Sequence, residues 1–153
     1  MTTRYAQNTT VNVDRSRVEV HRLLRKHGAT RVADAWEPGR AAVQFEIHGR
    51  VARLAVPLPT TAEVAARPRA RKAPAALRKA VEREERQRWR ALVLLLKAKL
   101  ESIELGLTTF DDEFLAALVL KDGSTMGESI ARSIEDGATR LLPAKGEGKH
   151  EPD

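Results

Sequence analysis

Few side chains of this sequence have the type and spacing that catalysis or metal binding needs. There are four histidines and no cysteine, which excludes thiolate zinc sites, iron–sulfur clusters and cysteine nucleophiles. His21 and His27 are six residues apart on a predicted helix, so they point in different directions. No phosphate-binding loop, dinucleotide-binding fingerprint or serine-nucleophile elbow is present. The sequence therefore predicts a protein without catalytic activity, metal or cofactor.

Two groups of charged residues are weaker candidates for chemistry. Glu46, His48 and Arg53 share the polar face of a predicted hairpin, where an acid/base or metal site is conceivable, but a cross-strand pair of Glu46 with Arg53 explains them without chemistry. The acidic cluster at residues 111–113 could bind a divalent cation. Without any cation, acidic side chains at a helix N-terminus stabilise the helix by their interaction with its dipole. We expect both groups to be structural.

The strongest functional signal is a block of basic residues in the middle of the chain. The chain has 153 residues and a net charge of +6. Residues 67–90 hold 10 basic and three acidic residues, a net +7, whereas residues 91–153 hold seven basic and 12 acidic residues, a net −5. A concentrated basic block favours a polyanion, because each phosphate that it neutralises releases bound counterions. The alternative interpretation is a solubilising linker together with a solvated helix face.

We predict that nucleic acid contacts this basic block and the polar face of the sheet. Binding of a single strand, or of a backbone by its shape, is favoured over recognition of a base sequence. Single-stranded DNA is the favoured ligand, and RNA is the alternative. The side chain of Trp36 would stack on unpaired bases if it is exposed and would belong to the core if it is buried. The predicted binding residues are Arg67, Arg69, Arg71, Lys72, Arg78, Lys79, Arg83, Arg86, Arg90, Trp36, His48 and Arg53.

The hydrophobic pattern predicts an α+β fold with a helix, a three-stranded antiparallel sheet, a long helix and short C-terminal helices. Residues 1–12 are polar and predict an extended arm, followed by a helix that starts near residue 14 and stops at Gly28. Alternating apolar and polar residues predict strands at 30–37, 41–48 and 51–58. Residues 1–58 thus supply a helix and the sheet.

Two turns decide which side chains lie opposite each other in the sheet. The pair Gly49-Arg50 predicts a type II′ turn, which would place Phe45 opposite Leu54 and make one face apolar. The turn at Pro38-Gly39 leaves two alternatives open. A two-residue loop puts Trp36 on the apolar face, and a three-residue loop puts it on the polar face.

The long helix is predicted to join the sheet in one domain that continues through residues 75–137. Residues 59–74 contain several prolines and predict an exposed basic linker. No glycine or proline interrupts the next segment before Gly106, which predicts one helix of about 31 residues. Its first half is mostly charged. Its second half is apolar on nearly every side, so we expect it to be covered all round, by the sheet on one side and by other helices or another subunit on the rest.

The C-terminal part is predicted to form two short helices and a tail. Thr109 precedes a helix at 110–118, and Thr125 with Glu128 forms a capping box for a last helix. Residues 138–153 predict a disordered tail.

The apolar stretch Ala91–Leu96 supports a second hypothesis, in which the chain is a helix-mediated homo-oligomer or assembly protein without nucleic-acid binding. The two hypotheses are compatible, because proteins that coat single strands often oligomerise. No apolar run approaches the roughly 20 residues of a membrane span, and the N-terminus lacks the apolar core of a signal peptide. We therefore expect a cytoplasmic protein without a membrane partner.

Several stretches resemble known families. The order of helix, three antiparallel strands and helix over residues 14–105, with Gln44–Arg50 as second strand and turn, is similar to double-stranded-RNA-binding domains. A sheet backed by a long helix also resembles phage single-strand annealing proteins. Arg88–Leu92, Lys97–Glu101 and Leu120–Gly123 resemble small uncharacterised proteins of actinobacteria and their phages. These resemblances imply a nucleic-acid-binding fold and a role in phage or mobile-element DNA metabolism.

Overall fold

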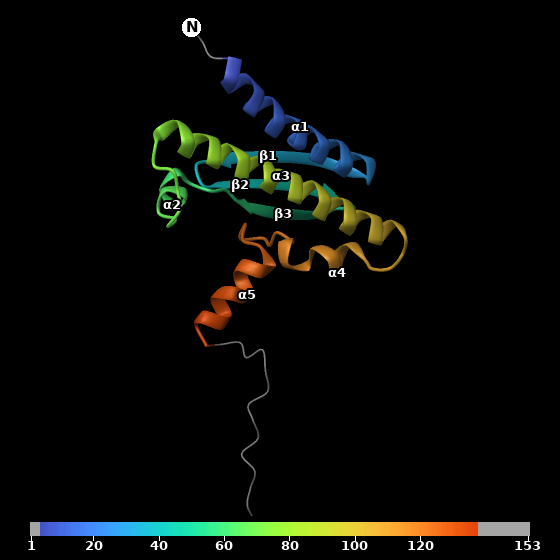
Figure 1. The fold of residues 1–153 in the computed structure, drawn as a ribbon. Helices are drawn as coiled ribbons and strands as arrows, with labels where there is room; N and C mark the ends of the chain where they lie inside the picture. Colours follow the sequence, from blue (N-terminus) through green and yellow to red (C-terminus); the bar gives the residue numbers. More distant parts are fainter. Residues whose placement is uncertain (1–3, 138–153) are drawn as a thin grey trace, which may run out of the picture.

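One antiparallel sheet and two long helices organise the protein (Figure 1). The computed structural model describes the backbone of residues 4–137 and the side chains of residues 13–137. The elements are α1 (Arg4–Lys26), β1 (Ala29–Glu37), β2 (Arg40–Ile47), β3 (Arg50–Pro57), α2 (Thr61–Ala65), α3 (Pro74–Glu104), α4 (Phe110–Phe114), the 3₁₀ turn η1 (Leu115–Ala117) and α5 (Met126–Glu135). The predicted α+β class and element order are confirmed.

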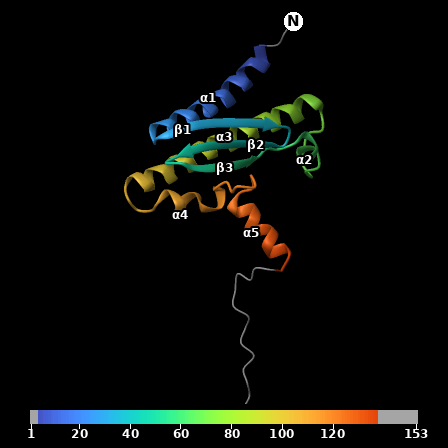
Figure 2. The same ribbon diagram turned by 180° about the vertical axis from the view of Figure 1, so that it is seen from behind.

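Helices α1 and α3 lie side by side on one face of the sheet, whose strand order is β1-β2-β3. The core forms between them: Val43 and Phe45 of β2, Leu24 of α1, and Leu96 of α3 are all at most 1% exposed. Figure 2, from behind, shows the strands in front of α3, so the opposite face of the sheet points away from both long helices.

The turn between β2 and β3 starts one residue earlier than predicted. His48 and Gly49 are the turn residues, and their φ angles of 50° and 74° are those of a type I′ turn, so the predicted type II′ turn at Gly49-Arg50 is wrong. Phe45 therefore lies opposite Ala52 instead of Leu54. The apolar face is still correctly predicted, because a register shift of two residues keeps every side chain on its own face.

Trp36 takes the first of the two predicted positions but stays exposed. The Pro38-Gly39 loop has two residues, with Glu37 opposite Arg40 and Trp36 opposite the buried Ala41. Trp36 thus shares the face that the helices cover. Because it lies at the end of an edge strand, its side chain is nevertheless 56% exposed.

Three predicted segments differ from the structure. Helix α1 begins at Arg4, so the extended arm predicted for residues 1–12 is wrong from residue 4 onward. Within the predicted linker 59–74, the sequence forms helix α2, whose Val64 is 4% exposed. The predicted helix at 110–118 is divided into α4 and η1. The predictions for residues 138–153 lie outside the described residues.

The long helix α3 has the predicted 31 residues but is covered on one side only. Leu92, Val93 and Leu96 are buried against α1 and the sheet. Leu94 and Leu95 are 55% and 47% exposed, so no other helix of the described residues covers this side, and its covering by another subunit stays a prediction. One helix and one sheet face leave the remaining side of a helix in water.

Asp34 of β1 ties the sheet to α1. Arg17 donates a hydrogen bond from Nη2 to Asp34 Oδ2, and His21 Nε2 lies 2.8 Å from Asp34 Oδ1. Burial alone would raise the pKa of Asp34, but the hydrogen bonds and charges of Arg17 and His21 outweigh it and hold this pKa below its ordinary value. The ionised carboxylate therefore stabilises the folded state.

We expect Asp34→Asn to lower the free energy of unfolding at pH 7 by about 1.5 to 3 kcal/mol, the usual contribution of hydrogen bonds to a charged group. Because the folded pKa lies below the unfolded one, this contribution is present above about pH 4 and is lost as the pH falls through the folded pKa. Urea denaturation at neutral and acidic pH measures it. A difference between wild type and variant that is equally large at both pH values would contradict the assignment.

Candidate nucleic-acid interface

A groove lies between residues 64–71 and the first part of α3. Its volume is 910 Å³, near the upper end of the range of about 300–1,000 Å³ that is usual for ligand sites. Apolar side chains of Val64, Leu77 and Ala80 contribute to its lining. Its charged lining has six basic and two acidic residues, a net +4: Arg67, Arg69, Arg71, Lys79, Arg83, Arg86, Glu82 and Glu84. We call this site the basic groove.

Helix α2 and one ion pair hold the two walls together. Thr60 and Glu63 cap α2 reciprocally, with Thr60 N donating to Glu63 Oε2 at 2.9 Å and Glu63 N donating to Thr60 Oγ1 at 3.2 Å. The Arg67 guanidinium then binds both carboxylate oxygens of Glu84 on α3, one of them at 3.0 Å. This hydrogen bond holds the pKa of Glu84 below its ordinary value. The chain between α2 and α3 is thereby fixed beside α3.

The remaining positive charge of the block is largely available to a ligand. Arg67 is neutralised by Glu84. In contrast, none of the following cations has an ion-pair partner among the described residues: Arg69, Arg71, Lys72, Arg78 and Arg86. Three of these five line the basic groove, and the other two lie in the same segment of the chain. Unpaired guanidinium groups beside an apolar lining suit a ligand that combines phosphates with flat bases.

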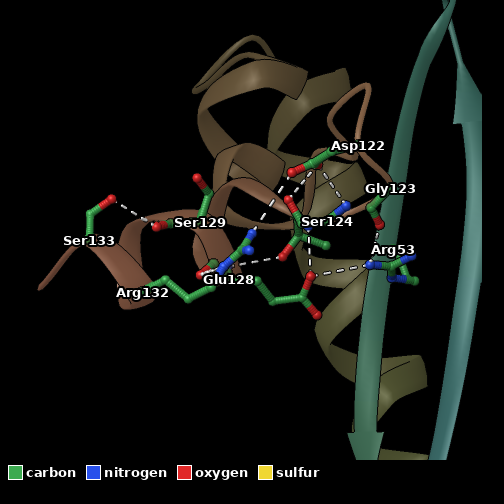
Figure 3. Close-up of polar contacts among 9 residues, drawn as sticks. Arg53, Asp122, Gly123, Ser124, Glu128, Ser129, Arg132 and Ser133 are labelled. Atoms are coloured by element: carbon green, nitrogen blue, oxygen red, sulfur yellow. Dashed lines mark hydrogen bonds and ion pairs between the residues drawn. The ribbon is translucent and has the colours of Figure 1, made fainter. Parts of the chain in front are cut away.

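Two predicted binding residues are bound elsewhere in the protein. Arg90 forms an ion pair with Glu19 of α1 at 3.0 Å, which links the two long helices. Arg53 donates to the carbonyl oxygen of Gly123 at 2.8 Å and to Glu128 Oε2 at 3.2 Å (Figure 3). Figure 3 shows its side chain pointing from β3 toward the segment before α5. Arg53 thus positions the C-terminal helix.

The structure does not bring Trp36, His48 and Arg53 onto one surface. Trp36 lies on the helix-covered face of the sheet, whereas Arg53 lies on the opposite face. His48 is a turn residue at the other end of β2. The predicted pair of Glu46 with Arg53 is also wrong, because Arg31 Nε donates to Glu46 Oε2 at 2.7 Å. These residues form no common acid/base site, and the binding surface predicted for the polar sheet face is not assembled.

The acidic cluster at residues 111–113 divides among separate partners. Asp111 accepts from Arg50 at 3.0 Å, Asp112 accepts from the Thr109 hydroxyl at 2.7 Å, and Glu113 accepts from Lys99 at 2.8 Å. Over residues 13–137, no group of three or more potential ligands is placed to hold a metal ion. The cluster therefore acts in the structure as a set of fold-stabilising contacts.

Sequence reasoning missed α2 and the role of Glu84. The capping-box pattern Thr60-x-x-Glu63 is visible in the sequence and signals a helix start. The pairing of Arg67 with Glu84 spans 17 residues, and the sequence has no local signal for it.

Comparisons with protein-family models, curated proteins and solved structures found no match to this chain. Among the described residues, no helix is both long enough and apolar enough to cross a bilayer.

Proposed function

We propose that this chain is a non-catalytic nucleic-acid-binding protein that holds a single strand, with DNA favoured, in the basic groove. The observation that carries the proposal is the groove itself: a concave site of 910 Å³ with unpaired arginines on its walls and apolar side chains in its lining. Arg69, Arg71 and Arg86 would contact phosphates. Bases would lie against the apolar lining near Leu77.

The shape of the site favours a flexible strand over a duplex. A single strand can enter a groove and turn its phosphates toward both walls. Proteins that bind single strands without sequence preference hold the backbone in a positively charged groove of this kind. A duplex displays its phosphates on a convex surface and would contact the rim alone. Backbone contacts of this kind give affinity without a base sequence preference. The resemblance of three short stretches to proteins of actinobacteria and their phages fits a role in phage or mobile-element DNA metabolism.

Fluorescence anisotropy with a labelled single-stranded DNA of about 20 nucleotides tests the proposal. We expect binding at about 50 mM salt that weakens steeply as salt rises, with a log–log slope of roughly −0.7 for each phosphate contacted. Duplex DNA and single-stranded RNA of the same sequence are the comparison ligands. Absence of binding to all three at low salt would refute nucleic-acid binding. Preference for the duplex would refute the single-strand assignment.

A further inference from the structure

The water-facing side of α3 carries an apolar stripe. From Ala91 to Leu105, its residues are separated by three, four or seven positions, and this spacing places them on one side of a helix. Leu94, Leu95 and Leu105 are 55%, 47% and 68% exposed. The intervening alanines are exposed as well. We call this surface the α3 stripe, and it consists of Ala91, Leu94, Leu95, Ala98 and Leu105. Glu101 and Ser102 occupy the same side of the helix in the turn between Ala98 and Leu105. Exposed leucines that recur on one side of a helix are typical of a helix–helix contact surface.

We propose that the α3 stripe binds the α3 stripe of a second copy of this chain, with the two helices antiparallel. A two-fold contact requires a surface that is complementary to itself. Ala98 is at the centre of the stripe, seven residues from Ala91 and from Leu105. In an antiparallel pair centred on Ala98, the small Ala91 of each copy lies opposite the large Leu105 of the other. The two central alanines allow the helices to approach closely.

The charges beside the stripe favour this orientation. Lys97 and Glu101 lie on the same edge of the stripe, both are exposed, and neither has an ion-pair partner among residues 13–137. In an antiparallel pair this edge faces its own copy with the direction reversed, so Lys97 of each chain meets Glu101 of the other. A parallel pair would turn Lys97 toward the opposite edge of the second copy, which carries Lys99, already bound to Glu113 at 2.8 Å, so Lys97 and Glu101 would not meet.

The proposed contact does not depend on nucleic acid. The basic groove uses residues 64–86, and the stripe uses residues 91–105, so both surfaces are available at once. Each copy would contribute one groove. Two grooves on one assembly would raise the affinity for a strand long enough to reach both, because the second contact becomes intramolecular.

Light scattering coupled to size-exclusion chromatography tests the contact without any ligand. We expect the wild-type chain at about 200 µM to have twice the monomer mass of 17.0 kDa and to dissociate on dilution. Ala98→Glu places two like charges at the two-fold axis and should give a monomer at the same concentration. At a concentration so low that both proteins are monomeric, its melting temperature should equal that of the wild type, because Ala98 is exposed. A monomeric wild type, or a dimeric Ala98→Glu variant, would overturn the proposal.

A charge exchange tests the orientation. Lys97→Glu alone should raise the dimer dissociation constant several-fold, because Glu101 of the second copy then faces a like charge. Adding Glu101→Lys to it should restore the wild-type dissociation constant, because a carboxylate at position 97 then faces an ammonium group at position 101 of the other copy. Ala131→Glu on the exposed side of α5 is the matched control and should leave the dimer intact. If the double variant is no better than the single one, the antiparallel arrangement is wrong.

Discussion

Replacing Arg69, Arg71 and Arg86 together by alanine is expected to weaken binding of single-stranded DNA by at least about 100-fold at about 50 mM salt. All three side chains line the basic groove, and none has an ion-pair partner among the described residues. Each lost phosphate contact means that fewer counterions are released on binding. The magnitude of the log–log salt slope should therefore fall by roughly 0.7 for each contact, or about 2 for the three. Anisotropy titrations at several salt concentrations measure both quantities.

A second triple variant separates the groove from net charge. Arg15, Arg22 and Arg25 of α1 are exposed, line no part of the groove and have no ion-pair partner among residues 13–137. Their replacement by alanine changes the net charge by the same amount. We expect this variant to bind within a few-fold of the wild type. Equal losses in the two variants would show that binding follows the overall charge, and the groove assignment would then be wrong. Thermal melting of both confirms that each is folded.

Local patterns were sufficient to predict most of the elements. The capping box at Thr125 and the uninterrupted helix after Pro74 both occur where the sequence predicts them. The strands were predictable because one face is apolar and the alternation has a period of two. The register was harder, because Gly49 can serve as the first residue of one turn type or the second of another. Burial of Ile47 and the contact of Arg50 with Asp111 accompany the observed register, and both depend on the tertiary fold.

The candidate site was predictable as charge but not as shape. The net +7 over residues 67–90 can be counted from the sequence whatever the fold, and it is the basis on which a polyanion partner is predicted. Which of these cations stay unpaired depends on contacts between distant residues, such as Arg90 with Glu19 and Arg67 with Glu84. Trp36 illustrates the same limit: its face follows from the turn length, but its exposure follows from its place at the end of an edge strand.

Trp89 lies where the charged half of α3 meets the apolar half, and its replacement by alanine is expected to cost about 3 to 5 kcal/mol of the free energy of unfolding. The side chain is 1% exposed and belongs to the core with Val20 and Leu24 of α1. The Arg17 guanidinium also lies over its ring, 5.9 Å from the centroid. Urea denaturation followed by circular dichroism measures the loss independently of tryptophan fluorescence.

Trp36→Ala is the matched control, because it removes the same side chain from a position that is 56% exposed. Its cost should be below about 1 kcal/mol, the usual range for surface substitutions. Trp89→Phe should recover much of the loss seen in Trp89→Ala, because it restores an aromatic ring and removes the buried Trp89 Nε1, which has no hydrogen-bond partner among the described residues. Equal costs for Trp89→Ala and Trp36→Ala would mean that α3 does not pack on α1 and the sheet through Trp89.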